Sequence, residues 1–119
     1  MARTETAFAD RFDEFCEGLR RDGLLLVSLD EDGRPNAMTI GRTTLRVVWG
    51  RAMCVVLVRP SRYTYTCIEA TNDFTVNVPP LELAEEVLFC GTESGRDYDK
   101  FAECGFTALP GSQVKSPTI

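Results

Sequence analysis

Apolar residues recur at helical spacing near the start of the chain. Phe8, Phe12 and Phe15 stand between charged residues, which is the pattern of an amphipathic helix with one buried face. Gly23 ends this pattern, and the two arginines before it occupy the favourable last turn of a helix. We therefore predict a helix over residues 5–21.

The next part of the chain carries the short apolar runs and turn residues of β-strands. Residues 24–29 are apolar except for one serine, residues 30–33 read Asp-Glu-Asp-Gly, and residues 35–40 return as a second run. The Asp-Gly pair supplies the positive φ of a hairpin turn. Similar reasoning predicts strands over 43–49, 53–58 and 73–78, helices over 61–70, 81–89 and 97–104, and at most one strand in the tail 106–119.

Short strands with hairpin signals, separated by helices, favour a mainly β fold with peripheral helices. We expect a single domain over residues 1–119, in which the N-terminal helix precedes a small antiparallel barrel over residues 24–119. The chain shows neither a strict βαβ alternation nor a GxGxxG motif. This disfavours a dinucleotide-binding fold of the Rossmann type.

Composition and charge narrow the classes of partner. With 44% hydrophobic and 26% charged residues, the 119-residue chain has enough apolar material for one core. A net charge of -5 gives no general attraction for nucleic acid or an anionic membrane, so a bound anion must meet a local site. The longest wholly apolar run, 53–58, is too short to span a bilayer, and the N-terminus lacks the apolar region of a signal peptide. We expect a cytoplasmic protein.

The cysteines and the missing histidines limit the possible chemistry. Five cysteines occur without a CxxC pair, so we expect reduced thiols, and the absence of sequence pairing disfavours a thiol redox function. The chain has no histidine, which disfavours a zinc site and excludes a Ser-His or Cys-His nucleophile within it. We assign no metal site and no catalytic residue.

Two segments have the composition of a binding site. Residues 35–41 alternate small and polar side chains after the hairpin turn, and Asn36, Met38 and Thr39 would form a flat wall for a polar heteroaromatic ring; the alternative is an ordinary strand. Residues 59–65 combine two arginines and two aliphatic hydroxyl groups with the start of a helix, which suits an anion. The alternative there is a simple N-cap beside solvated arginines.

Two further segments carry polar groups in unusual positions. Asn77 lies in an apolar strand, so its amide needs a partner; we favour a neighbouring backbone edge over a ligand. Residues 91–95 form a small flexible loop in which Ser94 and Gly95 would offer backbone contacts. Lys100 follows and would place a charge near a phosphate, although a capped helix with solvated charges is the alternative.

In this order, the segments 25–28, 35–39, 59–64, 74–79 and 90–101 resemble the flavin reductase-like family, especially its flavoredoxin-like members. The resemblance covers residues 24–119. It implies an FMN-binding split β-barrel, antiparallel and Greek-key-like, that works as a homodimer with flavin at or near the subunit interface. It also implies electron transfer from NAD(P)H, or from a protein donor, to flavin, ferric iron or another acceptor.

The resemblance also implies roles for individual residues. Asn36 and Thr39 would line the flavin. Ser61 and Thr64 would hold its phosphate, helped by Arg59 or Arg62. Lys100 would reach the phosphate or a polar atom of the flavin.

The chain departs from this family in two ways. Arg42 follows Gly41 where a tryptophan is common, and would attract a nucleotide phosphate or contact reduced flavin. The C-terminal strands of related chains, with a histidine and an aromatic residue, have no counterpart here. We therefore expect an incomplete barrel with an open edge and uncovered apolar residues on 24–29 and 53–58, which a dimer would cover.

Three functions remain open on this basis. The first is an NAD(P)H-dependent flavin or ferric reductase. The second is an FMN-binding electron carrier without NAD(P)H turnover, and the third is a flavin-free, truncated structural dimer.

Overall fold

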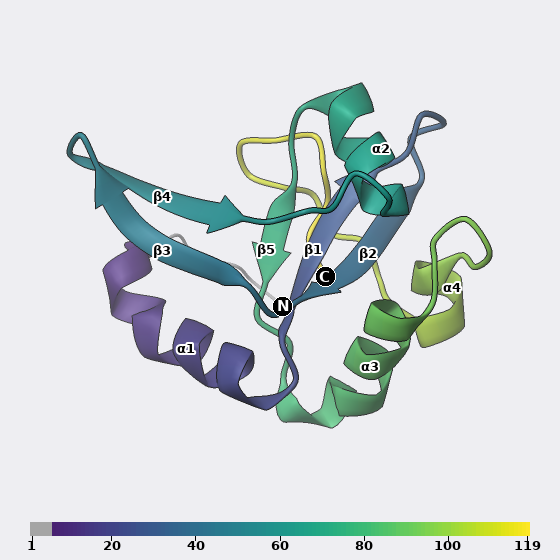
Figure 1. The fold of residues 1–119 in the computed structure, drawn as a ribbon. Coiled ribbons are helices and arrows are strands. Elements are labelled where there is room, and N and C mark those ends of the chain that lie inside the picture. The colour runs from purple at the N-terminus through teal and green to yellow at the C-terminus, as the bar shows by residue number, and fades with distance from the viewer. Residues whose placement is uncertain (1–5) are drawn as a thin grey trace.

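Two antiparallel sheets form the framework of the protein in the computed structural model, which describes residues 6–119. The larger sheet has the strand order β2-β1-β5, and the smaller one is the hairpin β3-β4 (Figure 1). The strands are β1 (Leu24–Leu29), β2 (Pro35–Ile40), β3 (Thr43–Val48), β4 (Arg51–Val56) and β5 (Thr75–Asn77).

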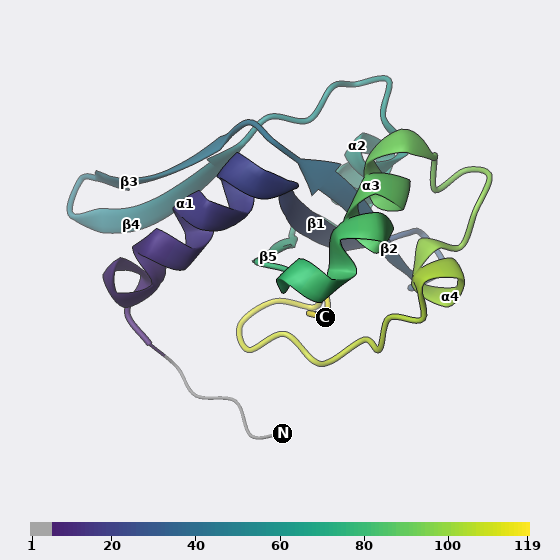
Figure 2. The same ribbon diagram turned by 90° about the horizontal axis from the view of Figure 1, so that it is seen from below.

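Helices cover both faces of the larger sheet. They are α1 (Phe12–Arg21), α2 (Tyr63–Thr71), α3 (Ala84–Thr92) and α4 (Lys100–Cys104), with short 3-10 helices at Phe8–Arg11 and Leu81–Leu83. Helix α1 runs along the β3-β4 hairpin, whereas α3 and α4 lie together beyond β2 (Figures 1 and 2).

The central strand β1 is buried on both faces. Because alternate side chains of a strand point to opposite faces, Leu25 and Val27 pack with Val87 and Phe101 from the helical side. Leu24 and Leu26 belong to a second cluster, which contains Phe15, Met38 and Ile40 and is joined by hairpin residues. The four residues from Leu24 to Val27 are at most 1% exposed. The expectation that residues 24–29 lack cover is therefore wrong, because α1, α3 and α4 supply it.

The predicted barrel does not close within residues 6–119. Strand β4 pairs with β3 alone, and β5 has only three residues, so the two sheets remain separate. The result is a mixed sheet-and-helix fold. The expectation of uncovered apolar residues on 53–58 is confirmed, because Met53, Val55 and Leu57 are exposed.

The hairpin predicted over 24–29 and 35–40 is confirmed, and in its register Leu24 pairs with Ile40. Other boundaries differ from the predictions. Residue 5 of the predicted first helix lies outside the described residues. Ser61 does not cap α2, because Arg62 occupies the N-cap position and no side chain caps the helix.

The strand predicted over 73–78 is shorter because the Asp73 side chain binds the C-terminal segment. Its carboxylate accepts hydrogen bonds from the Ser116 hydroxyl and from the amides of Lys115 and Ser116. In the tail, a single antiparallel bridge between Leu109 and Thr118 replaces a full strand.

Candidate functional site

Three of the four candidate segments meet beside the edge strand β2. They line two cavities of about 270 and 560 Å³, which share Met38, Arg59 and Arg62 and therefore adjoin. We call the smaller one the basic cavity; its walls include Ser61, Thr64, Cys90, Ser94, Gly95 and Lys100. We call the larger one the β2 cavity; its walls include Thr39, Ile40, Gly41, Arg42, Leu57 and Val58.

A buried hydrogen bond joins β2 to the start of α2. Asn36 Nδ2 donates to Thr64 Oγ1 over 2.8 Å, and the two residues are only 5% and 2% exposed. A hydroxyl group has one proton to donate and two lone pairs. Since Thr64 accepts from Asn36, its own proton is available to a ligand in the basic cavity.

The loop that precedes α4 passes very close to this hydrogen bond. A Cβ atom at Gly95 would clash with Asn36 Oδ1 and would lie 2.6 Å from the Tyr63 ring. Real Cβ atoms do not approach so closely, so a side chain at position 95 would push the loop outwards. Glycine is required here for its small size.

Arg96 fastens the same loop to the start of α2. Its Nη1 donates to the Ser61 carbonyl over 3.2 Å, and its guanidinium lies 5.6 Å from the centre of the Tyr63 ring. Such a cation-π contact contributes roughly 0.5–1 kcal/mol at an exposed site. The sequence does not predict Tyr63 or Arg96 as site residues, because only the fold brings the two segments together.

Lys100 is a buried cation without an anionic partner. It is 4% exposed, and its Nζ donates to the Cys90 carbonyl over 2.8 Å. No carboxylate among residues 6–119 forms an ion pair with Lys100, Arg59 or Arg62. Burial lowers the pKa of Lys100, and the charge of Arg62 lowers it further, while Cys90, Cys104 and Glu93 oppose this shift. The basic cavity is therefore lined by four cationic side chains, Arg59, Arg62, Arg96 and Lys100, against one carboxylate, Glu93, so positive charge is in excess at its wall.

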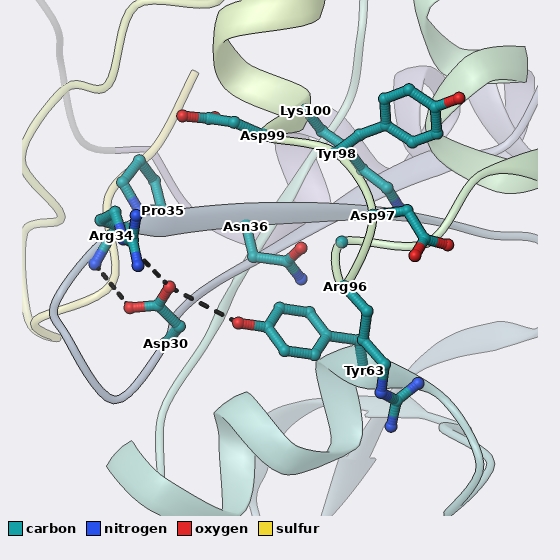
Figure 3. A pocket seen from close by; sticks show the side chains of 11 residues that line it. Asp30, Arg34, Pro35, Asn36, Tyr63, Arg96, Asp97, Tyr98, Asp99 and Lys100 are labelled. Carbon is teal, nitrogen blue, oxygen red and sulfur yellow. Dashed lines mark hydrogen bonds and ion pairs between the residues drawn. The ribbon is translucent and has the colours of Figure 1, made fainter.

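A third cavity, of about 410 Å³, shares Tyr63, Gly95, Arg96 and Lys100 with the basic cavity (Figure 3). Its charges are balanced, because Asp30, Asp97 and Asp99 face Arg34, Arg96 and Lys100, and Arg34 pairs with Asp30 at 3.6 Å. Tyr63 Oη donates to Asp30 over 3.5 Å. Burial raises the pKa of the Tyr63 phenol, and the charges of Cys67 and Asp30 raise it further. An anion is therefore better accommodated in the basic cavity than here.

The remaining predicted site residues lie in different settings. Met38 is buried between the two adjoining cavities, and Arg42 is exposed at the β2 cavity. The Thr39 hydroxyl donates to the Val87 carbonyl, which leaves its backbone facing the β2 cavity. The Ser94 hydroxyl accepts from the Arg96 amide.

Asn77 lies apart from this group. Its Nδ2 donates to the Leu25 carbonyl over 3.2 Å, and its Oδ1 accepts from the Ile119 amide over 3.2 Å. These bonds satisfy backbone groups, which is the alternative favoured from the sequence.

Other classes of site find no support in the described part of the chain. Residues 6–119 contain no group of three side chains suited to hold a metal ion. None of the helices described there is long and apolar enough to cross a membrane.

Comparison with known proteins identifies one family. The profile described as "Flavin reductase like domain" matches residues 21–119. An uncharacterized protein of Archaeoglobus fulgidus is 31% identical over 86 residues, which are 72% of this chain and 48% of that protein. An uncharacterized protein of Pyrococcus abyssi is 36% identical over 67 residues, which are 56% of this chain and 38% of that protein.

Solved structures agree with this match. Flavoredoxin of Desulfovibrio vulgaris (Miyazaki F) has 30% identity and a TM-score of 0.75, over 80% of this chain and 51% of that one. Flavoredoxin from Methanosarcina acetivorans has 29% identity and a TM-score of 0.71, over 83% and 51%. An FMN-binding domain from Shewanella baltica, at 19% identity and a TM-score of 0.70, shares the fold. The chain spans about half the length of these structures and less than half of the two uncharacterized relatives.

Proposed function

Because the chain belongs to the flavin reductase like family, we propose that it binds FMN and transfers electrons from NAD(P)H to flavin or ferric iron. The FMN phosphate occupies the basic cavity, and the ring system lies along β2 in the adjoining cavity. The observation that carries this proposal is the cluster of Lys100, Arg59 and Arg62, which form no ion pair within residues 6–119 and outnumber Glu93, the carboxylate at the same cavity.

The donors of the basic cavity suit a phosphate ester. Thr64 offers a hydroxyl proton, and the first turn of α2 has no side-chain cap to satisfy its amides. Free amides and the helix dipole at this end favour an anion. Lys100 supplies a buried charge, whose attraction for phosphate is stronger than in water. Ser61, Ser94 and Gly95 complete the wall.

The β2 cavity suits a planar ring. Met38, Thr39 and Gly41 line it from the edge strand, with Leu57 opposite. The outer edge of β2 has no pairing strand, so its amides and carbonyls are available to polar ring atoms. Arg42 places a positive charge at this cavity, and Asn36 holds the join between β2 and α2. When bound, the flavin itself supplies the redox chemistry.

A comparison of the affinities for FMN and riboflavin tests the proposed roles of the two cavities, in which the basic cavity binds the phosphate and the β2 cavity binds the ring. We expect the protein to quench FMN fluorescence on titration and to bind riboflavin at least about tenfold more weakly, because riboflavin lacks the phosphate. Arg62→Ala should weaken FMN binding, whereas Arg34→Ala, which removes an ion-paired arginine from the third cavity, should not. Failure to retain FMN, or equal affinity for both flavins, would refute the proposed site.

A carrier without NAD(P)H turnover is the second candidate. It is favoured by the similarity to two flavoredoxin structures at 29–30% identity. FMN-loaded protein that oxidises NADH or NADPH with ferricyanide as acceptor supports the reductase. FMN-loaded protein that is reduced by dithionite but not by either nucleotide supports the carrier.

We further infer that the protein is a homodimer and that its two sheets are parts of an FMN-binding split barrel. The TM-score of 0.75 to a flavoredoxin supports the barrel. Exposed apolar residues on and beside the β3-β4 hairpin, namely Val47, Trp49, Met53, Val55 and Leu57, support the dimer. Five free cysteines are compatible with a cytoplasmic location.

A further inference from the structure

Two cysteines that are far apart in the sequence face each other in the fold. Cys90 Sγ lies 3.9 Å from Cys104 Sγ. Cys90 belongs to α3 and is 1% exposed, whereas Cys104 is the last residue of α4 and is half-buried. We propose that Cys90 and Cys104 form a reversible disulfide that closes the loop between them, and that this pair is a redox modification site of the protein.

The surroundings aim the two sulfur atoms at each other. Cys104 Sγ also contacts the Glu86 carbonyl at 3.9 Å, so the end of α4 already packs on α3. Cys90 and Phe101 share one core cluster, with Cys104 packed against it. A disulfide needs the sulfur atoms about 2 Å apart. Closing the gap therefore needs a shift of about 2 Å at the end of a five-residue helix, with no rearrangement of the sheet.

The segment enclosed by this bond carries much of the basic cavity. Ser94, Gly95 and Lys100 lie between the two cysteines, and Lys100 Nζ donates to the carbonyl of Cys90 itself. A link between the ends of the loop restricts the conformations that the enclosed residues adopt. Oxidation of the thiol pair would therefore restrict the conformational freedom of the loop between Cys90 and Cys104.

The difference in burial between the two thiols sets the order in which they react. Burial raises the pKa of Cys90 to about 12, and both Cys104 and Glu86 add to this rise. The charge of Lys100 opposes it. Burial also raises the pKa of Cys104, which hydrogen-bonding to Cys90 opposes. Cys104 is the more accessible thiol, so it meets an oxidant first and Cys90 then completes the bond.

The reaction balances with a small disulfide such as oxidised glutathione. Cys104 loses its proton and attacks one sulfur, which forms a mixed disulfide and releases one glutathione thiol. Cys90 then loses its proton and attacks Cys104 Sγ, which releases the second glutathione thiol. The protein loses two protons and two electrons, and the glutathione disulfide gains both.

The test is mass spectrometry of the whole protein in glutathione buffers of increasing oxidised fraction. We expect a loss of two hydrogens at equilibrium. Digestion with trypsin and glutamyl endopeptidase should then yield residues 87–93 linked to residues 104–115, because Glu69, Glu82 and Glu86 separate Cys90 from Cys67. Cys90→Ser should instead accumulate one glutathione on Cys104.

A second readout reports the loop. Oxidation should slow tryptic cleavage after Arg96 by about tenfold, because the loop must open locally before a protease binds it. Cys54→Ser, which removes another half-buried thiol, should leave both the link and the protection unchanged. Failure of residues 87–93 and 104–115 to link while another thiol of the folded protein is glutathionylated would overturn the proposal.

The consequence for ligand binding rests on the proposed FMN site. A fixed loop should lower the FMN dissociation constant by about two- to fivefold, because less ordering is needed on binding. Protein that forms the link but never binds FMN would refute the FMN site and leave the disulfide standing. Protein that binds FMN but never forms the link would refute the disulfide and leave the FMN site standing.

Discussion

Asn36 and Thr64 are joined by a buried hydrogen bond of 2.8 Å that fixes the edge strand β2 against the first turn of α2. Thr64→Val keeps the shape of the side chain but leaves the Asn36 amide without its partner. We expect a loss of about 1–3 kcal/mol in the free energy of unfolding, measured by urea denaturation. Thr64→Ser, which keeps the hydroxyl, should lose less than half as much; an equal loss in both variants would contradict this assignment.

Gly95 and Gly41 form a matched pair of positions for adding one methyl group. A Cβ atom at Gly95 meets Asn36 and Tyr63, whereas one at Gly41 meets nothing within 4 Å. Gly95→Ala should therefore cost about 1–3 kcal/mol of stability through overpacking and displace the Arg96 contact. Gly41→Ala should change the melting temperature little, and similar shifts in both would show that the loop yields freely.

Lys100→Met should stabilise the free protein while weakening FMN binding. The change removes a buried charge but also the hydrogen bond to Cys90, so a net gain of about 1 kcal/mol is expected. Burial lowers the pKa of Lys100, and the unfolded chain therefore binds more protons at alkaline pH. Stability of the natural protein accordingly rises as pH approaches the usual lysine pKa. The advantage of the variant in urea denaturation should shrink over this range; a constant difference would argue against a charge effect.

Asp73 should make the protein sensitive to acid. Hydrogen bonding from Ser116 lowers the pKa of this carboxyl, with the Lys115 and Ser116 amides adding to the effect. Its contribution is present above the usual aspartate pKa and is lost as pH falls through the lowered folded-state value. Ser116→Ala should cost about 1–2 kcal/mol at neutral pH and less in acid. Ser112→Ala, on an exposed serine of the same tail, should have little effect at either pH.

Trp49 provides a direct test of the dimer. It is the single tryptophan of the chain and is 98% exposed in one copy. If the hairpin is an interface, tryptophan emission should shift to shorter wavelength as protein concentration rises. Trp49→Asn keeps the positive φ of the turn, which asparagine tolerates, and should weaken dimerisation at least about tenfold by light scattering. A monomer at all concentrations, with unshifted emission, would contradict the dimer.

The local part of the fold could be predicted from the sequence. Strands β1 and β2 follow from two apolar runs around Asp-Glu-Asp-Gly, because turn chemistry and hydrophobic patterning there give the same answer. The start of α2 could not be predicted in this way. Ser61 is a residue type that favours the N-cap position, but the helix begins at Tyr63 and Arg62 occupies the N-cap. Residues 24–29 are buried because helices pack against them. The hydrophobic pattern of a strand does not predict which helices pack on it.

The site shows the same division. Ser61, Thr64, Gly95 and Lys100 are predicted as site residues because hydroxyl, glycine and charge cluster in short segments, and all four line the basic cavity. The contact of Arg96 with Tyr63, the approach of Cys90 Sγ to Cys104 Sγ and the lack of an ion pair for Lys100 within residues 6–119 are relations between separate segments. They depend on tertiary structure, which local spacing does not encode.

The position of Lys100 in the basic cavity should also determine which anions the protein binds. The chain as a whole carries a net charge of -5, while this ammonium is 4% exposed at the wall of a cavity of about 270 Å³. A long polyanion would bring most of its charge against an acidic exterior before any phosphate reached the lysine. A single compact phosphate ester enters without that repulsion. We therefore expect the fold to discriminate by the size of the charged group as well as by its sign, and higher salt should reduce the difference in affinity between the two kinds of anion.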